Sequence, residues 1–183
     1  MSKNTSTLYL ICPGFHEKKV TDSFVETITN YFPHLDNLLI FPTLEYPPYS
    51  GFHLVEYLQE KCQKKTQKLM FIAFSAGVVA AVTAAWQWQL QGGKIKGLIA
   101  FDGWGVPLLG NFPIYRISHD EFTHYSSAIL GKGDLSFYAD PAVDHLGLWR
   151  SPDQVKGWMS EASGRDQTFL SPLSLMEFLD KVL

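Results

Sequence analysis

Ser75 stands where a strand-like segment meets a helix-like segment, within Ala73-Phe74-Ser75-Ala76-Gly77. The apolar run from Leu69 to Phe74 has the length of a buried strand, and the Ala-rich and Val-rich stretch that follows has the length of a helix. A serine on such a sharp turn exposes its hydroxyl above the edge of a sheet, as in the G-x-S-x-G nucleophile elbow. Here alanine replaces the first glycine, which adds a single methyl group. The pattern therefore predicts a nucleophilic serine.

A serine hydroxyl is a weak nucleophile unless an imidazole accepts its proton and a carboxylate orients that imidazole. The ends of later predicted strands supply both groups. In chain order the expected triad is Ser75, Asp120 and His145, with Asp102 as the alternative acid. The chemistry that this set predicts is acyl transfer, which also needs backbone N–H groups directed at the developing oxyanion.

Alternating strand and helix patterns must position these residues. We expect strands at 7–12, 37–41, 69–74, 95–101, 114–118 and 135–139, and helices at 22–32, 52–65, 76–91, 121–130 and 173–183. The last of these helices is expected to be opened by Ser171-Pro172, and a further helix by Ser151-Pro152. Such alternation predicts an α/β fold, a three-layer sandwich with a mostly parallel central sheet of about six strands. The carboxyl ends of parallel strands meet at one edge, which is where the candidate residues fall.

Composition indicates one globular domain spanning 1–183, because 46% hydrophobic and 18% charged residues are ordinary values for such proteins. A net charge of −3 gives no electrostatic signature for nucleic acid or for a membrane surface. The apolar run from Leu8 to Cys12 is too short for a signal peptide or a membrane span. Cys12 and Cys62 are interpreted as unpaired thiols, so we expect a cytoplasmic protein.

The chain resembles a small α/β-hydrolase. The resemblance rests on Ala73-Phe74-Ser75-Ala76-Gly77, on Pro13-Gly14-Phe15 after the first strand, on an acid after the penultimate strand, and on Asp144-His145-Leu146 after the last. It implies Ser75 as nucleophile, His145 as general base and Asp120 as orienting acid. It also implies an oxyanion hole formed by the N–H groups of Phe15 and Ala76.

Other interpretations stay open for these residues. Some relatives place the acid where Asp102 lies, and Asp140 and Asp144 are close to His145 in sequence. Asp120 is also a suitable N-cap for the helix that follows it. Ser75 is also compatible with a small corner residue that has no chemistry.

No cofactor and no metal are expected. His119, Asp120 and His124 lie close in sequence but lack a recognised metal-site spacing, and the glycine pairs lack the context of a phosphate-binding loop.

The expected substrate is a small-molecule carboxylic ester or thioester with an apolar acyl or aryl group. No separate cap domain fits between Asp102 and Pro113, but the apolar segment 103–112 is suited either to a wall or flap over Ser75 or to simple packing on the sheet. The residues expected to contact substrate are Gly14, His16, Trp104, Leu146 and Trp149. Sequence alone gives no oligomeric state.

A second function class competes with this one. The missing glycine at position 73 and the two candidate acids are also compatible with a catalytically idle α/β-hydrolase-fold protein that binds a small ligand or a protein partner.

Overall fold

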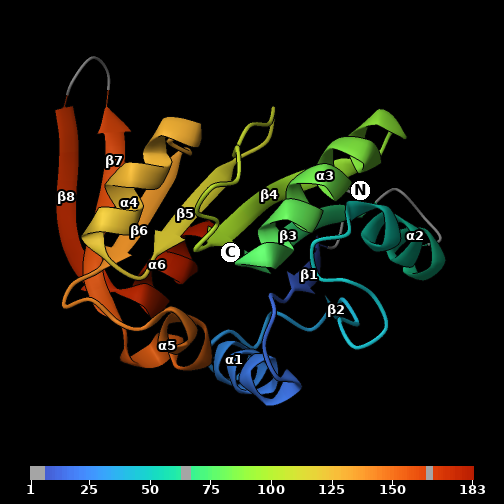
Figure 1. Ribbon diagram of the computed structural model, residues 1–183, viewed down its shortest axis with the longest axis horizontal. Coiled ribbons are helices and arrows are strands. Elements are labelled where there is room, and N and C mark those ends of the chain that lie inside the picture. Colours follow the sequence, from blue (N-terminus) through green and yellow to red (C-terminus); the bar gives the residue numbers. More distant parts are fainter. Residues whose placement is uncertain (1–6, 63–66, 164–166) are drawn as a thin grey trace, which may run out of the picture.

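The computed structural model describes residues 7–62, 67–163 and 167–183. Eight strands form one sheet in the order β2-β1-β3-β4-β5-β6-β7-β8 (Figure 1). In that order they are Leu38–Ile40, Thr7–Cys12, Lys68–Phe74, Lys94–Phe101, Ile114–Ser118, Leu135–Ala139, Lys156–Ser163 and Gln167–Ser174. The first six are parallel to their neighbours, and β7 and β8 add an antiparallel hairpin at one edge. The predicted fold class is confirmed.

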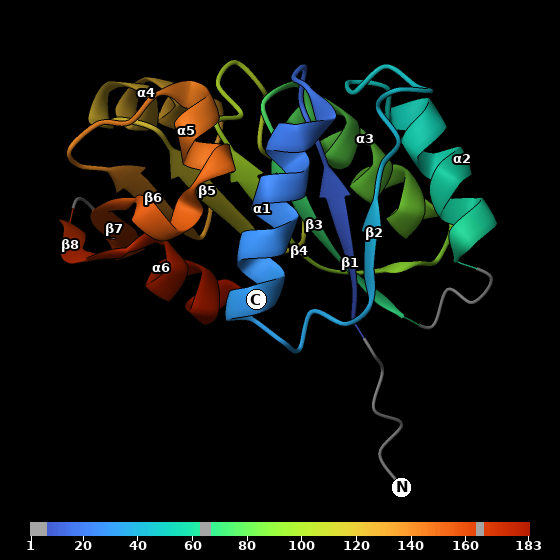
Figure 2. The same ribbon diagram turned by 90° about the horizontal axis from the view of Figure 1, so that it is seen from below.

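Helices cover both faces of the sheet, which makes the three expected layers. One face carries α1 (Lys18–Tyr31), α5 (His145–Arg150) and α6 (Leu175–Val182), which lie in front of the sheet in Figure 2. The opposite face carries α2 (Gly51–Lys61), α3 (Ala76–Leu90) and α4 (Glu121–Ser127). Short 3-10 turns at Ala128–Leu130 and Pro152–Gln154 follow α4 and α5.

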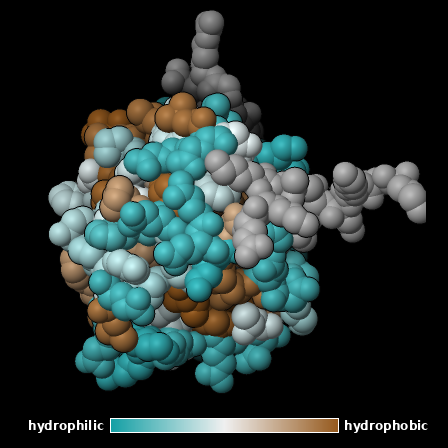
Figure 3. Space-filling model, turned by 90° about the vertical axis from the view of Figure 1, so that its right-hand side faces the viewer, coloured by the Kyte–Doolittle hydropathy of each residue, from teal (hydrophilic) through white to brown (hydrophobic). Residues whose placement is uncertain are grey.

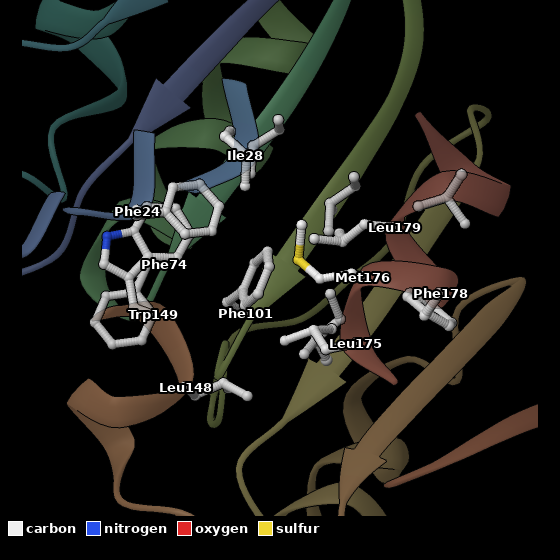
Figure 4. Close-up of a cluster of buried hydrophobic side chains, with 14 of the residues drawn as sticks. Phe24, Ile28, Phe74, Phe101, Leu148, Trp149, Leu175, Met176, Phe178 and Leu179 are labelled. Carbon is white, nitrogen blue, oxygen red and sulfur yellow. The ribbon is translucent and has the colours of Figure 1, made fainter. Parts of the chain in front are cut away.

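Strand periodicity divides the interior into two apolar layers. In β1, Tyr9 and Ile11 face the layer under α1, whereas Leu8 and Leu10 face the layer under α3. The first layer is rich in aromatic rings, with Phe24 of α1 lying against side chains from the sheet and from α5 (Figure 4). Each fully buried ring of this kind stabilises the fold by roughly 2–3 kcal/mol through the area that it removes from water. Burial on both faces explains the continuous apolar runs of the central strands.

Small residues allow α3 to lie close to the sheet. A Cβ added at Gly77 would lie 2.1 Å from the carbonyl oxygen of Cys12 and 2.6 Å from that of Pro13. Only glycine therefore fits where the first turn of α3 contacts the end of β1. This contact places the loop after β1 beside the N-terminus of α3.

The C-terminal region differs from the prediction. The helix expected after Ser151-Pro152 is only a 3-10 turn, and the chain then forms the β7–β8 hairpin that the sequence analysis missed. Pro172 lies in β8, the edge strand, where a residue without an N–H group is tolerated. The last helix, α6, is capped by Ser174 and Glu177 in a capping box rather than by Ser171.

β2 forms the opposite edge of the sheet. The side of the molecule seen in Figure 3 is covered largely by hydrophilic residues, interrupted by separate hydrophobic areas. Among the helices of the described residues, none combines the length and the apolar character that crossing a membrane requires.

Candidate active site

Ser75 occupies a strained turn between β3 and α3. Its φ of 52° and ψ of −119° lie outside the regions that non-glycine residues ordinarily adopt. The turn is held by a hydrogen bond of 2.9 Å from the Ser75 N–H to the carbonyl of Phe101, at the end of β4. Strain of this kind persists only where surrounding structure enforces it, and it is common at functional sites. The sequence pattern of the elbow and the backbone geometry agree.

The loop after β1 lies directly against this turn. A Cβ added at Gly14 would be 3.0 Å from Cβ of Ser75 and 3.0 Å from the carbonyl oxygen of Phe74, so residue 14 must be small. Phe15 follows in this loop, and Ala76 is the first residue of α3. Neither backbone N–H donates a hydrogen bond to another group in the described part of the chain. Two free donors therefore flank Ser75, as an oxyanion hole requires.

His145 is the first residue of α5 and lies beside the elbow. Its ring stacks on Phe74, the residue before Ser75, with centroids 4.6 Å apart. The preceding loop is tied to the end of β5 by a hydrogen bond of 3.0 Å from the Val143 N–H to the carbonyl of His119. The His145 side chain is 45% exposed, so the ring borders solvent at the same sheet edge as Ser75.

The Ser75 hydroxyl and His145 are not hydrogen-bonded to each other within the residues that the structure describes. Catalytic hydrogen bonds of this type often tighten only when substrate binds. The ring is nevertheless positioned on the residue that precedes Ser75.

Asp102, at the end of β4, is the carboxylate that contacts His145. Its Oδ2 lies 2.7 Å from Nδ1 of His145, and its side chain is only 2% exposed. The backbone of Asp102 has a φ of 47°, a second strained position at this edge, and its N–H donates to the carbonyl of Ile117 at 2.8 Å. An ionised carboxylate only accepts hydrogen bonds, so Nδ1 of His145 carries the hydrogen and Nε2 has the free lone pair.

The preference for Asp120 as the orienting acid is not supported by this geometry. Asp120 is the N-cap of α4, and its Oδ1 accepts a hydrogen bond of 2.6 Å from the Thr123 N–H. Partial burial acts to raise the pKa of Asp120, but hydrogen bonds from Thr123 and the nearby His119 outweigh it, and the pKa lies below its ordinary value. The alternative acid, Asp102, takes the place beside His145.

Two of the five residues expected to contact substrate lie beside the elbow. Gly14 contacts Ser75, and His16 lies against Phe74 with ring centroids 5.4 Å apart. Burial, and secondarily the nearby His145, lowers the pKa of His16. Its Nε2 is 2.7 Å from the hydroxyl of Thr21, so the His16 ring is anchored to α1.

The remaining three are placed differently. Trp149 is completely buried and stacks on Phe24 with centroids 3.5 Å apart, so it supports α5 from below and cannot form a rim (Figure 4). Leu146 is half-buried against the same core. Trp104 is 65% exposed, and its Nε1 donates to the hydroxyl of Ser126 at 3.3 Å.

The segment 103–112 is packed over much of its length. Leu108 and Phe112 are buried, and the Leu108 N–H donates to the carbonyl of Leu130 at 2.9 Å. Trp86 of α3 donates to the carbonyl of Leu109 at 2.9 Å. These contacts support the packing interpretation of the segment, with Trp104 and Leu109 exposed.

An open groove of about 460 Å³ adjoins the oxyanion loop. Its walls are Gly14, Phe15 and His16 on one side and the loop 43–49 on the other. Phe15 is 69% exposed, and its ring lies 5.9 Å from that of Tyr49. The groove therefore offers aromatic surface beside the loop whose Gly14 contacts Ser75.

Sequence reasoning missed the contact of His119 with Asp102. This histidine lies beside Asp102. Its Nδ1 is 2.9 Å from Oδ2 of Asp102, and its backbone N–H donates to Oδ1 at 2.9 Å. The available signal was its position directly after β5, at the same edge as the other strand-end residues. Two histidines thus share one buried carboxylate.

A metal ion could in principle find ligand atoms here. One possible ligand atom from each of Asp102, His119 and His145 lies within 4.8 Å of the others in the described residues. Both Nδ1 atoms are already within hydrogen-bond distance of the same carboxylate oxygen. Hydrogen bonding accounts for the arrangement, and His124, considered earlier with His119 and Asp120, is buried elsewhere against Tyr138.

Comparisons with known proteins give similarity to solved structures alone, because neither a family model nor a curated protein matches the sequence. A protein from Pectobacterium atrosepticum described as a YdeN-like hydrolase is 17% identical, with a TM-score of 0.49 over 73% of this chain and 75% of that one. YbtT, the type II thioesterase of the yersiniabactin pathway, is 18% identical, with a TM-score of 0.40 over 60% of this chain and 46% of its own. The sheet order and the elbow at Ser75 themselves give this chain the fold of a small α/β-hydrolase.

Proposed function

We propose that this chain is a serine hydrolase that cleaves a carboxylic ester or thioester through an acyl-enzyme. The observation that carries the proposal is the convergence of a strained Ser75 with the His145–Asp102 pair at one edge of the sheet. Ser75 is the nucleophile, His145 the general base and Asp102 the orienting acid. The proposed mechanism uses no metal and no cofactor.

In the first half of the reaction, Nε2 of His145 accepts the proton of the Ser75 hydroxyl as Oγ attacks the carbonyl carbon. Asp102 accepts the Nδ1–H bond and stabilises the imidazolium that forms. The N–H groups of Phe15 and Ala76 stabilise the oxyanion, a contribution worth about 3–4 kcal/mol per donor in comparable sites. Collapse of the intermediate expels the alcohol or thiol, which takes the proton from His145.

In the second half, His145 removes a proton from water, which attacks the acyl-serine ester. The acid is released and Ser75 regains its hydrogen. The exposed position of His145 gives water direct access to the imidazole.

The apolar groove supports the choice of substrate class. Phe15 and Tyr49 present aromatic surface beside the nucleophile, and an acyl or aryl group placed there would be removed from water. An ester or thioester with an apolar acyl or aryl part is therefore the proposed substrate.

A fluorophosphonate probe tests the assignment directly, because it reacts with activated serines. We expect wild-type protein to be labelled, and Ser75→Ala and His145→Ala to abolish labelling. Ser23→Ala is the matched control, since Ser23 lies on the exposed side of α1 and bonds only to a carbonyl of its own helix. Labelling that persists in Ser75→Ala, or folded wild-type protein that is never labelled, would exclude the hydrolase.

The absence of a Ser75–His145 hydrogen bond among the described residues favours the competing function, an idle fold that binds a ligand or partner. That alternative predicts no covalent labelling at all. The same experiment therefore separates the two functions.

A further inference from the structure

Asp102 accepts three hydrogen bonds, and two of them come from one residue. His119 donates its backbone N–H to Oδ1 at 2.9 Å and its Nδ1 lies 2.9 Å from Oδ2, the oxygen that also contacts His145. His119 therefore forms hydrogen bonds to both oxygens of the Asp102 carboxylate. The two imidazole rings are nearly perpendicular, at 79°, with centroids 6.0 Å apart.

This geometry restricts the hydrogen positions on both rings. Because Oδ2 of an ionised carboxylate only accepts, each Nδ1 that contacts it must carry hydrogen. The His119 bond consequently holds Asp102 in the rotamer that keeps His145 in its Nδ1–H tautomer, with the Nε2 lone pair available. Without the Nδ1 bond of His119, the Asp102 side chain would keep only two hydrogen bonds, from the His119 backbone N–H and from His145.

The His119 ring also lies near a second carboxylate. Its Nε2 lies 3.5 Å from Oδ2 of Asp120, whose carboxylate is bound to the Thr123 N–H. The titratable groups around the His119 ring are thus Asp102 from β4, Asp120 before α4 and His145 of α5. With hydrogen on Nδ1, a neutral His119 has only a lone pair on Nε2, so the hydrogen bond that holds the ring is the one to Asp102.

We propose that His119 is a positioning residue for catalysis, which acts on the reacting groups through Asp102. The inference rests on the proposed hydrolase and adds to it a second histidine, which contacts Asp102 and has no hydrogen bond to Ser75 within the described residues.

Three substitutions at position 119 test this. The amide nitrogen of asparagine occupies the place of Nδ1, so His119→Asn retains the donor to Asp102, whereas the longer glutamine places its amide beyond it and alanine has none. Loss of one hydrogen bond to a charged group is expected to lower kcat for a p-nitrophenyl ester about 10- to 100-fold in His119→Ala and His119→Gln. KM should stay unchanged, and His119→Asn should recover most of kcat.

A positioning role and a purely structural role predict different results. Equal kcat in the alanine variant and the wild type would overturn the inference. So would equal losses in the alanine and asparagine variants accompanied by equal falls in melting temperature, because the asparagine variant keeps the donor.

A readout independent of activity separates this inference from the proposed function. Nitrogen NMR of the histidine rings at alkaline pH reports which nitrogen carries hydrogen. We expect both His119 and His145 in the Nδ1–H form in the wild type, and His145 in mixed tautomers in His119→Ala. An Nε2–H form of His119 in the wild type would contradict the inference even if the enzyme is active, whereas the expected tautomers without probe labelling would contradict the hydrolase alone.

Discussion

Nδ1 of His145 lies 2.7 Å from Oδ2 of Asp102, a carboxylate at the end of β4, the strand next to the one that ends at Ser75. The acid was expected at Asp120, after β5, whereas Asp102 follows β4. The hydrogen bond from the Asp102 N–H to Ile117 ties the end of β4 to β5, and the Val143 N–H ties the His145 loop to the same place. His145 and Asp102 are therefore positioned by one network of strand-end hydrogen bonds.

This relationship predicts opposite outcomes for the two candidate acids. Asp102→Asn removes the charge that stabilises the imidazolium and allows the wrong tautomer, so kcat should fall about 10³- to 10⁴-fold. Asp120→Asn keeps a side-chain oxygen that can cap α4, so kcat should stay within about threefold of wild type. Steady-state kinetics with one chromogenic ester measures both. The reverse ranking would return the acid to Asp120.

The sequence was sufficient for the elbow and its surroundings because their signals are local. The apolar run of β3, the small residues of α3 and the serine between them define one strand-turn-helix unit, and the glycine at position 77 is demanded by contact with β1. The loop with Gly14 and Phe15 follows from the same strand order. Local pattern and tertiary contacts agree here, which is why Ser75 was placed correctly on a strand-to-helix turn.

The distinction between the two candidate acids depends on tertiary structure rather than on local sequence. Asp102 and Asp120 both follow parallel strands at the same edge, and their distinction depends on the positive φ of Asp102 and on which side chain is already engaged as a helix cap. The sequence indicates that Asp120 can cap a helix, but it shows neither the positive φ of Asp102 nor which carboxylate faces His145. The contact of His119 with Asp102 was missed because it, too, depends on tertiary structure.

The β7–β8 hairpin was missed because Ser-Pro pairs resemble helix starts. Pro172 is tolerated where it lies only because β8 has no partner on its outer side among the described strands. Whether a strand lies at the edge of a sheet depends on tertiary structure, so the local sequence does not reveal it.

Gly77→Ala is expected to destabilise the fold. The added methyl group would lie 2.1 Å from a backbone oxygen of β1, so either α3 or the strand must move. Overpacking of this severity should cost about 3 kcal/mol of unfolding free energy, measured by urea titration. Val79→Ala, at a partly exposed position of the same helix, is the control and should cost less than about 1 kcal/mol. Equal stability of Gly77→Ala and the wild type would show that this contact is not tight.

Phe15→Ala should weaken binding of apolar substrates without removing the oxyanion donor, since the backbone N–H remains. Loss of the aromatic surface beside Tyr49 is expected to raise KM for an octanoyl ester about 5- to 20-fold, and to change that for an acetyl ester little. Phe52→Ala is the control, because Phe52 is equally exposed but lies outside the groove. A uniform change in KM for both esters would place the acyl group elsewhere.

His124 should make the protein lose stability as the pH falls from 6.5 to about 4. The ring is buried beside Arg116, and burial first and the guanidinium second lower its pKa from 6.5 to about 4. Its Nδ1 also has no hydrogen-bond partner in the described residues. Below pH 6.5 the unfolded chain therefore binds a proton at His124 that the folded protein does not bind. By linkage the free energy of unfolding then falls as pH decreases.

The loss should reach roughly 2–3 kcal/mol between pH 6.5 and pH 4, and the contribution is absent above pH 6.5, where the ring is neutral in both states. In His124→Phe the ring keeps its packing against Tyr125 and Tyr138 but cannot be protonated, so this part of the pH dependence should disappear. Urea unfolding at intervals of half a pH unit measures the difference, with His34→Gln, at an exposed position, as the control. Parallel curves for His124→Phe and the wild type would mean that the imidazole accepts a proton in the folded state as readily as in the unfolded one.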